Sequence, residues 1–306
     1  MIVALAGGIG AAKLLLGFSK LLPPNQLTVI GNTGDDIELF GLRICPDLDT
    51  ITYTLSEKIN PETGWGLQDD SFECLRTLQD LGAPSWFRLG DRDLATHLWR
   101  TSLLKQGHSL TQVTARICEA FGTHCRLLPM TDSYTPTYLA TEQGELHVQE
   151  YLVREKCRPV LRGLKYLNIK EAQPTPGVAD AIPKAEGVFL CPSNPFISIG
   201  PILAIPGIRE LLVQTEAPVF AVTPIVGQRA LKGPAAKMLA ELGYPLSPTA
   251  VAGLYKDFLN VFVLDEQDRQ LRAEIEGLGV KAVTINTVMS SIEDKINLAR
   301  ELLELL

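Results

Sequence analysis

The sequence predicts an α/β protein with a Rossmann-like, doubly wound, mostly parallel sheet and an inserted helical and β-hairpin cap. The chain opens with a continuous apolar run, Met1–Ala6, which is typical of a strand covered on both faces. A glycine turn and a helical pattern, Ala11–Leu22, follow, and two prolines end the helix. Leu27–Ile30 is a second apolar run, so residues 1–30 form a strand–helix–strand unit with a right-handed crossover.

A similar alternation returns late in the chain and supplies the remaining strands of the sheet. Strands are predicted at Gly187–Leu190, Pro218–Val222, Val261–Leu264 and Lys281–Ile285, with helices at Ile205–Gln214 and Ala235–Leu242. An amphipathic helix, Ser290–Leu306, closes the chain, and Ser290 and Glu293 have the spacing of a capping box.

The middle of the chain has a different pattern. Helical periodicity covers Ser71–Leu81, Leu94–Gln106 and Leu110–Phe121, whereas Thr137–Thr141 and Glu145–Val153 alternate around Gln143-Gly144 like a hairpin. We therefore divide the chain into a nucleotide-binding core, residues 1–70 and 183–306, and an inserted cap or substrate region, residues 71–182.

Composition and charge narrow the class of protein. The 306 residues carry 28 basic and 35 acidic side chains, a formal net charge of −7, without a run of Lys or Arg, which argues against nucleic-acid or anionic-membrane partners. No apolar stretch reaches the roughly 18 residues of a membrane span. The N-terminus lacks the basic region of a signal peptide, and Lys13 interrupts its apolar run. The six scattered cysteines favour reduced thiols, so we expect a cytoplasmic protein.

Gly7-Gly8-Ile9-Gly10 lies between the first strand and the first helix. Backbone N–H groups and the helix dipole favour a phosphate there, although a tight turn packed against the sheet explains the glycines equally well. The dinucleotide fingerprint fits poorly, because Lys13 stands where its third glycine belongs and the second strand ends at Asn32 rather than at an acid. A hydride-transfer enzyme is therefore disfavoured.

Acidic residues follow the second strand at its carboxyl end, the edge at which α/β sheets bind ligands. Asp35 and Asp36 come first, and Asp47 and Asp49 follow shortly after. Carboxylates at a phosphate-binding edge suit Mg²⁺, which combines one or two carboxylates with waters and substrate phosphates. The alternative is turn or helix capping, and Asp49 has the position to cap a helix that begins near Thr50.

Three further segments are candidates for ligand contacts. Asn60–Gly66 and Trp86–Asp93 place aromatic side chains among glycines and charges, in either a ligand-binding loop or a turn with ion pairs. Pro192–Pro201 follows a late strand, and its hydroxyls and amide either position a nucleotide or belong to an irregular turn.

Six segments occur in the order typical of one protein family: GGIGAAKLLLGF, NTGDDIELFGLRICPDLDT, NPETGWG, WFRLGDRDLATH, PSNPFISIGPILAIPGIR and residues Pro224–Ala236. From Met1 to about Asp265, the sequence resembles the 2-phospho-L-lactate transferases of deazaflavin coenzyme F-420 biosynthesis. The resemblance implies a homodimer and an Mg²⁺-dependent reaction. The phospholactyl group of lactyl-2-diphospho-5′-guanosine, or its phosphoenolpyruvyl analogue, is joined to the deazaflavin FO with release of GMP.

The resemblance also implies roles for particular residues. Asp36 and Asp49 are the predicted catalytic acids, and Asp35, Asp36 and Asp49 the predicted metal ligands, with Asp36 the first choice. The predicted nucleotide-binding residues are Gly7, Gly8, Gly10, Asn32, Ser193 and Asn194. Trp65, Trp86 and the Leu128–Asp132 turn are candidates for contact with the flat deazaflavin. A sister family of nucleotide-sugar-binding regulatory proteins shares the glycine loop and is the alternative, although the GWG and WFRLGDRDLATH segments favour the transferase.

Overall fold

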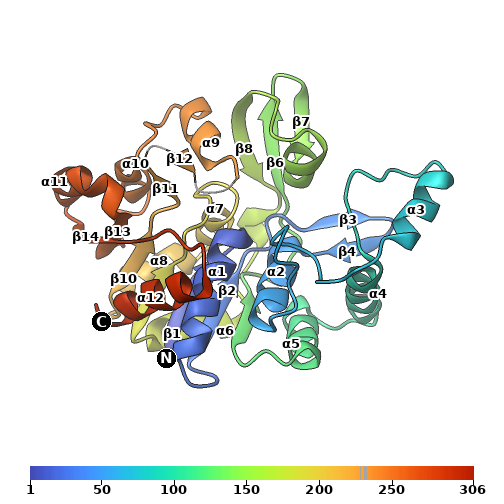
Figure 1. Ribbon diagram of the computed structural model, residues 1–306, viewed down its shortest axis with the longest axis horizontal. Helices are drawn as coiled ribbons and strands as arrows, with labels where there is room; N and C mark the ends of the chain where they lie inside the picture. The colour runs from blue at the N-terminus through green and yellow to red at the C-terminus, as the bar shows by residue number, and fades with distance from the viewer. Residues whose placement is uncertain (228, 231–232) are drawn as a thin grey trace.

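The computed structural model describes residues 1–227, the backbone of residues 229–230, and residues 233–306 (Figure 1). A seven-stranded sheet, in the order β14-β13-β10-β9-β1-β2-β5, forms its centre, and all neighbouring strands in it are parallel. The strands are β1 (Ile2–Ala6), β2 (Leu27–Gly31), β5 (Arg126–Pro129), β9 (Gly187–Leu190), β10 (Val219–Val222), β13 (Val261–Asp265) and β14 (Lys281–Ile285). The predicted Rossmann-like α/β class is confirmed.

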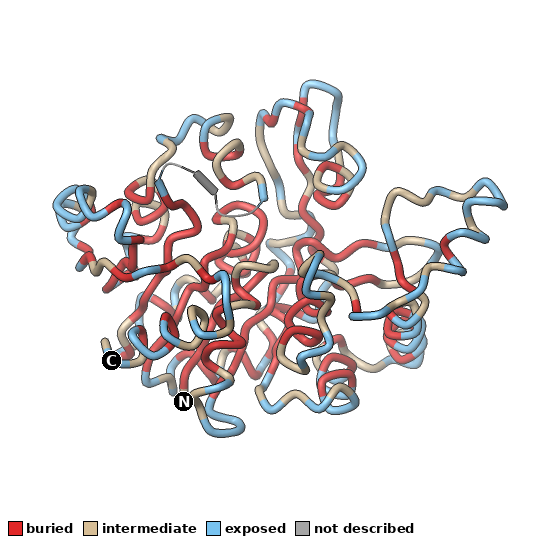
Figure 2. Tube along the Cα trace, viewed as in Figure 1, coloured by how far each residue is buried: buried red, intermediate tan, exposed pale blue. Residues whose placement is uncertain are grey.

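Helices cover both faces of the sheet, which explains why the strands are apolar throughout. Along β1, the side chains of Ile2 and Ala4 pack into one core and those of Val3 and Leu5 into the other. The first core is covered by α1 (Gly8–Leu21), α2 (Pro46–Leu55), α5 (Leu110–Phe121) and α12 (Ile292–Leu303). The second is covered by α6 (Pro176–Ala181), α7 (Ile199–Ala204), α8 (Ile208–Gln214), α9 (Ala235–Glu241), α10 (Pro248–Gly253) and α11 (Arg272–Glu276). The central strands are accordingly the most continuously buried part of the molecule (Figure 2).

Three smaller antiparallel units surround the sheet. The hairpin of β3 (Ile37–Leu39) and β4 (Leu42–Ile44) extends toward α3 (Glu73–Asp80) and α4 (Asp91–Lys105) (Figure 1). A three-stranded sheet is made of β6 (Thr137–Thr141), β7 (Gly144–His147) and β8 (Leu161–Tyr166). The third unit pairs β11 (Ile225–Val226) with β12 (Arg229–Ala230). Of the motif at Pro224–Ala236, residues 228 and 231–232 lie outside the described residues.

Several predicted boundaries were wrong. The hairpin around Gln143-Gly144 is present, but its second strand ends at His147, and a π-helical turn, Glu150–Arg154, replaces the rest of the predicted strand. The capping box of α12 uses Ser291 and Asp294 rather than Ser290 and Glu293. Both pairs have the same spacing, and the Asp294 carboxylate accepts the N–H groups of both serines, which selects the later register.

The inserted segment is closely joined to the core. β5 lies within residues 71–182, yet it pairs with β2 at the edge of the central sheet. The division into a core and a cap stays a prediction. Among the described residues, no helix combines the length and apolar character needed to cross a bilayer.

The order of the strands determines where a ligand can bind. The chain passes from β1 to β2 on one side, whereas β9 lies on the other side of β1 and leads away through β10 and β13. The switch point of the sheet therefore lies between β1 and β9, and the loops that leave these two strands diverge there. In open α/β sheets the crevice at this point is the usual ligand site.

Candidate active site

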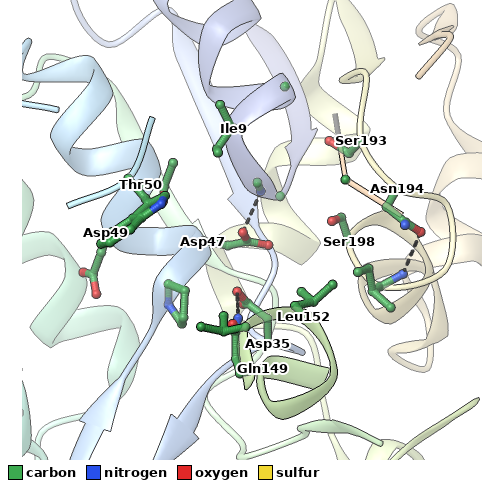
Figure 3. A pocket seen from close by; sticks show the side chains of 18 of the residues that line it. Ile9, Asp35, Asp47, Asp49, Thr50, Gln149, Leu152, Ser193, Asn194 and Ser198 are labelled. Carbon is green, nitrogen blue, oxygen red and sulfur yellow. Dashed lines mark hydrogen bonds between the residues drawn. The ribbon is translucent and has the colours of Figure 1, made fainter. Parts of the chain in front are cut away.

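A cavity of about 830 Å³ lies at the carboxyl ends of β1 and β9 (Figure 3). The glycine turn after β1, the loop after β2 and the start of α2 form one side. The loop after β9 and the start of α9 form another side. The π-helical turn of the inserted region and the aromatic segments around Trp65 and Trp86 complete the wall. The predicted segments on both sides of the switch point thus meet in one cavity.

The glycine turn is tightly packed from two directions. A Cβ atom at Gly7 would lie 2.6 Å from Asp47 Oδ2, and one at Gly10 would lie 2.4 Å from the carbonyl oxygen of Pro192. Gly8, the first residue of α1, has φ +74°, a conformation that side chains other than glycine rarely adopt. The glycines are therefore required by the packing of the turn, and the turn and the first residues of α1 line the cavity.

Asp47 belongs to the acidic cluster that the sequence indicates, but it was not among the residues predicted to be catalytic or to bind the metal. Its carboxylate accepts a 2.6 Å hydrogen bond from the Gly8 N–H and a 2.8 Å hydrogen bond from Asn32 Nδ2. Burial raises the pKa of Asp47 to about 6, although both of these hydrogen bonds act in the opposite direction. The available signal was Pro46, because a proline at the first position of a helix places the next residue in the first turn.

Asp35 lies beside Asp47 on the floor of the cavity (Figure 3). Its Oδ2 accepts a 3.1 Å hydrogen bond from Gln149 Nε2, while its buried Oδ1 has no hydrogen-bond partner among the described residues. Burial and the charge of Asp47 raise the pKa of Asp35 well above its ordinary value.

The Asp35–Asp47 pair fits a divalent cation. A cation bound here would be coordinated by the unpartnered carboxylate oxygen. Its positive charge would also offset the repulsion between the two carboxylates. The described residues contain no group of three or more His, Cys, Asp or Glu side chains arranged for a metal. Such an ion would therefore complete its coordination with waters and substrate phosphates, as Mg²⁺ commonly does.

Asp36, the first choice for the metal, does not line the cavity. Its fully buried carboxylate accepts hydrogen bonds from Arg43 Nε and Cys45 Sγ, both at 3.1 Å. Burial raises the pKa of Asp36, and the charge of Arg43 opposes this effect. The structure therefore places Asp36 in an ion pair beside the cavity rather than in its wall.

Asp49 does line the cavity, but its carboxylate is held by Arg100. Arg100 donates to both carboxylate oxygens from its two terminal nitrogens, and Arg100 is itself almost completely buried. His97 lies beside both residues, with its Nδ1 3.1 Å from Arg100 Nη1. Tyr53 donates a 2.7 Å hydrogen bond to Asp93 on α4. α2 and α4 are thus joined by a buried polar network.

The predicted nucleotide-binding residues have different environments. Asn32 is fully buried and does not line the cavity; it donates to Asp47 and accepts from the Gly34 N–H. Ser193 lines the cavity, and its buried Oγ has no partner among the described residues. Asn194 also lines it, but its Oδ1 accepts the N–H groups of Phe196 and Ile197. The Ser193 hydroxyl is therefore a buried group at the cavity wall without a partner among the described residues, whereas Asn32 and Asn194 hold the surrounding loops.

Aromatic side chains form an apolar part of the wall. Trp65, Trp86 and Phe87 line the cavity together with Arg88. The rings of Trp86 and Phe87 meet edge to face, with centroids 5.6 Å apart. The Leu128–Asp132 turn does not line the cavity, because Leu128 and Met130 are buried in the core.

These features define a Rossmann-like α/β protein whose main described cavity lies at the switch point of its sheet. The chain belongs to the 2-phospho-L-lactate transferase family, because the model of "2-phospho-L-lactate transferase CofD" matches residues 2–298. The resemblance inferred from the sequence is confirmed.

Two relatives cover nearly the whole chain. The phosphoenolpyruvate transferase of Streptomyces griseus is 42% identical over 99% of this chain and 98% of its own length. The 2-phospho-L-lactate transferase of Methanosarcina mazei is 39% identical over 97% of both chains. A Bacillus halodurans protein of the UPF0052 family has a similar structure, with a TM-score of 0.64, 14% identity and coverage of 99% of this chain and 98% of its own. This last likeness shows the fold alone.

Proposed function

We propose that the protein transfers a 2-phospholactyl or phosphoenolpyruvyl group from a guanosine-diphospho donor to FO and releases GMP. The oxygen of the terminal ribityl hydroxyl forms a bond to the phosphorus nearer the three-carbon acid. The bond from this phosphorus to the oxygen bridging to GMP breaks, GMP leaves with that oxygen, and the hydroxyl proton is released to the solvent. The relatives named for the two donor types match this chain at about equal identity, which supports the reaction class and leaves both donors in the proposal.

The switch-point cavity would hold the donor diphosphate at the amino end of α1. The dipole of this 14-residue helix favours an anion at that end, and Lys13 adds a positive charge to the lining. Ser193 faces the same space from the loop after β9 and would donate its hydroxyl to the nucleotide part. Positioning and charge neutralisation are the main contributions a protein makes to such a transfer.

Asp35 and Asp47 would hold Mg²⁺, because their carboxylates share the floor of the cavity and one Asp35 oxygen is unpartnered. A bound Mg²⁺ would supply positive charge against the donor phosphates. We assign Asp36 and Asp49 to other tasks, since each is paired with an arginine. Asp49 lines the cavity and would orient the acceptor hydroxyl. Asp36 would support the loop that carries Asp35 through its ion pair with Arg43.

The aromatic part of the wall would hold the deazaflavin. Trp65, Trp86 and Phe87 offer apolar surface to a flat ring system, and Arg88 lies beside them. This arrangement leaves the acceptor and the nucleotide at different ends of the cavity, with Asp35 and Asp47 between the glycine turn and the π-helical turn (Figure 3).

The observation that carries the proposal is the full-length match to both kinds of transferase together with a cavity at the switch point. The test is to incubate the purified protein with Mg²⁺, FO and either guanosine-diphospho-lactate or guanosine-diphospho-enolpyruvate. We expect GMP and a phosphodiester of FO, both detected by mass spectrometry. If neither product forms with either donor, and the protein instead binds a uridine nucleotide sugar, the regulatory alternative replaces the transferase.

A further inference from the structure

One lysine of α9 fastens the inserted region to the core behind the cavity. Lys237 Nζ donates hydrogen bonds to Tyr151 Oη at 3.0 Å, to the Pro159 carbonyl oxygen at 2.7 Å and to Glu241 Oε2 at 2.6 Å. An ammonium group has three N–H donors, so these contacts use all of them. Glu241 Oε2 also accepts a 2.8 Å hydrogen bond from the Leu161 N–H of β8. We name the Lys237–Glu241 pair with these partners the α9 clasp.

The α9 clasp holds both ends of the loop formed by residues 151–159. Tyr151 and Pro159 stand at the two ends of this loop, and both are bound to the same ammonium group. Within the loop, Lys156 and Cys157 have φ angles of +52° and +57°, which residues other than glycine rarely adopt. The Cys157 N–H donates to the Tyr151 carbonyl oxygen at 2.8 Å, so the residue that the clasp holds also supports this turn.

The loop and the start of α9 both line the cavity. Leu152, Lys156 and Cys157 line it from the loop, and Pro234 and Ala235 line it from the start of α9. The residue just before the π-helical turn is Gln149, whose side chain holds Asp35. Movement of the loop away from α9 would therefore widen the cavity and displace a partner of Asp35.

We propose that Lys237 is a positioning residue, which sets the separation between the 151–159 loop and α9 and so shapes the donor-binding part of the cavity. Its Nζ is bound to three protein oxygens, and its role is to act through the loop rather than to touch the substrate. This inference rests on the proposed function, because it assigns the cavity to a guanosine-diphospho donor.

The test compares Lys237→Met with three other variants in steady-state GMP release and in calorimetric titration with GDP. Tyr151→Phe removes one of the three contacts and keeps the aromatic packing. Lys237→Arg restores a charged donor. Lys165→Met is the matched control. Lys165 also forms a Lys–Glu ion pair, with Glu145 within the three-stranded sheet of β6, β7 and β8, but it does not line the cavity.

We expect the KM for the donor and the Kd for GDP to rise on the order of tenfold in Lys237→Met, with kcat within about twofold of the wild type. Tyr151→Phe should show a smaller rise, Lys237→Arg partial recovery and Lys165→Met wild-type values. A clasp that only stabilises the fold would lower the melting temperature without this change in KM, and unchanged KM and Kd would overturn the proposal. If Lys237→Met does not fold, Tyr151→Phe decides between the same two results.

Measurements on the wild-type protein separate the positioning role of Lys237 from the proposed function. A wild-type protein that neither binds GDP nor releases GMP contradicts both. A wild-type protein that does both, with a Lys237→Met variant of unchanged donor KM, contradicts only the positioning role.

Discussion

The Asp47 carboxylate accepts the N–H of Gly8, 39 residues earlier in the chain, at 2.6 Å. This contact joins the first turn of α2 to the first turn of α1 and places a buried acid against the glycine turn. The absence of a side chain at Gly7 permits it, because a Cβ atom there would lie 2.6 Å from the other oxygen of Asp47. The glycine turn and the acidic loop are therefore one structural unit.

Gly7→Ala should disrupt this unit. The added methyl group would meet Asp47 Oδ2 and, at 2.9 Å, the Cβ of Ser198, so the turn must shift. We expect a loss of about 1–3 kcal/mol in the free energy of unfolding, the usual cost of overpacking. Urea denaturation measures it, and Gly163→Ala is the control because its Cβ would meet no atom within 4 Å. Equal unfolding midpoints for the two variants would contradict the close packing.

Asn194→Ala should act mainly on the loop after β9. The Asn194 Oδ1 accepts two backbone N–H groups, and its loss leaves them without this partner. We expect a loss of about 1–2 kcal/mol in stability, with a smaller effect on GDP affinity. Asn194→Asp keeps the acceptor oxygen and should retain most of the stability. A variant of wild-type stability with strongly weakened GDP binding would instead identify Asn194 as a direct ligand contact.

The pair of acids in the cavity should make the effect of Mg²⁺ depend on pH. The pKa of Asp47 rises from the ordinary value of about 4 to about 6 in the folded protein, so the folded state binds the proton more tightly than the unfolded state. Without metal, this group's contribution to stability is therefore greatest below about pH 4 and falls as the pH rises through about 6.

Mg²⁺ binds the ionised form and should offset this loss above the folded pKa. We expect Mg²⁺ to raise the melting temperature more at pH 7.5 than at pH 5. Thermal unfolding with and without Mg²⁺ at both pH values measures the difference. Equal shifts would mean that the cation binds elsewhere.

The fold was largely predictable because its strands are buried on both faces. Continuous apolar runs such as Met1–Ala6 and Gly187–Leu190 correspond closely to observed strands. β5 was missed, because Arg126–Pro129 is a short edge strand that ends in a proline and follows a helix. The π-helical turn was also missed, since Glu145–Val153 alternates like a strand. The contact between Tyr151 and Lys237, which is distant in sequence, is formed in the π-helical conformation.

The candidate site was predictable as a region but not residue by residue. Four acids follow β2, and the sequence shows that they lie near one edge of the sheet. Which of them form ion pairs depends on Arg43 and Arg100, which bind Asp36 and Asp49. Arg100 is 51 residues from Asp49 and belongs to another helix, so no local pattern reveals this pairing.

In the function proposed above, Asp35 and Asp47 hold the divalent cation. Electron paramagnetic resonance with Mn²⁺ in place of Mg²⁺, in the presence of GDP, tests it most directly. We expect the wild type to bind Mn²⁺ and Asp35→Asn to bind it on the order of 100-fold more weakly, since even partners of metal ligands affect affinity by about 10–100-fold. Asp36→Asn should weaken Mn²⁺ binding much less than Asp35→Asn, because its carboxyl group does not line the cavity and would act only through Arg43. Retained Mn²⁺ binding in Asp35→Asn, with loss in Asp36→Asn, would contradict the assignment and return the metal to Asp36.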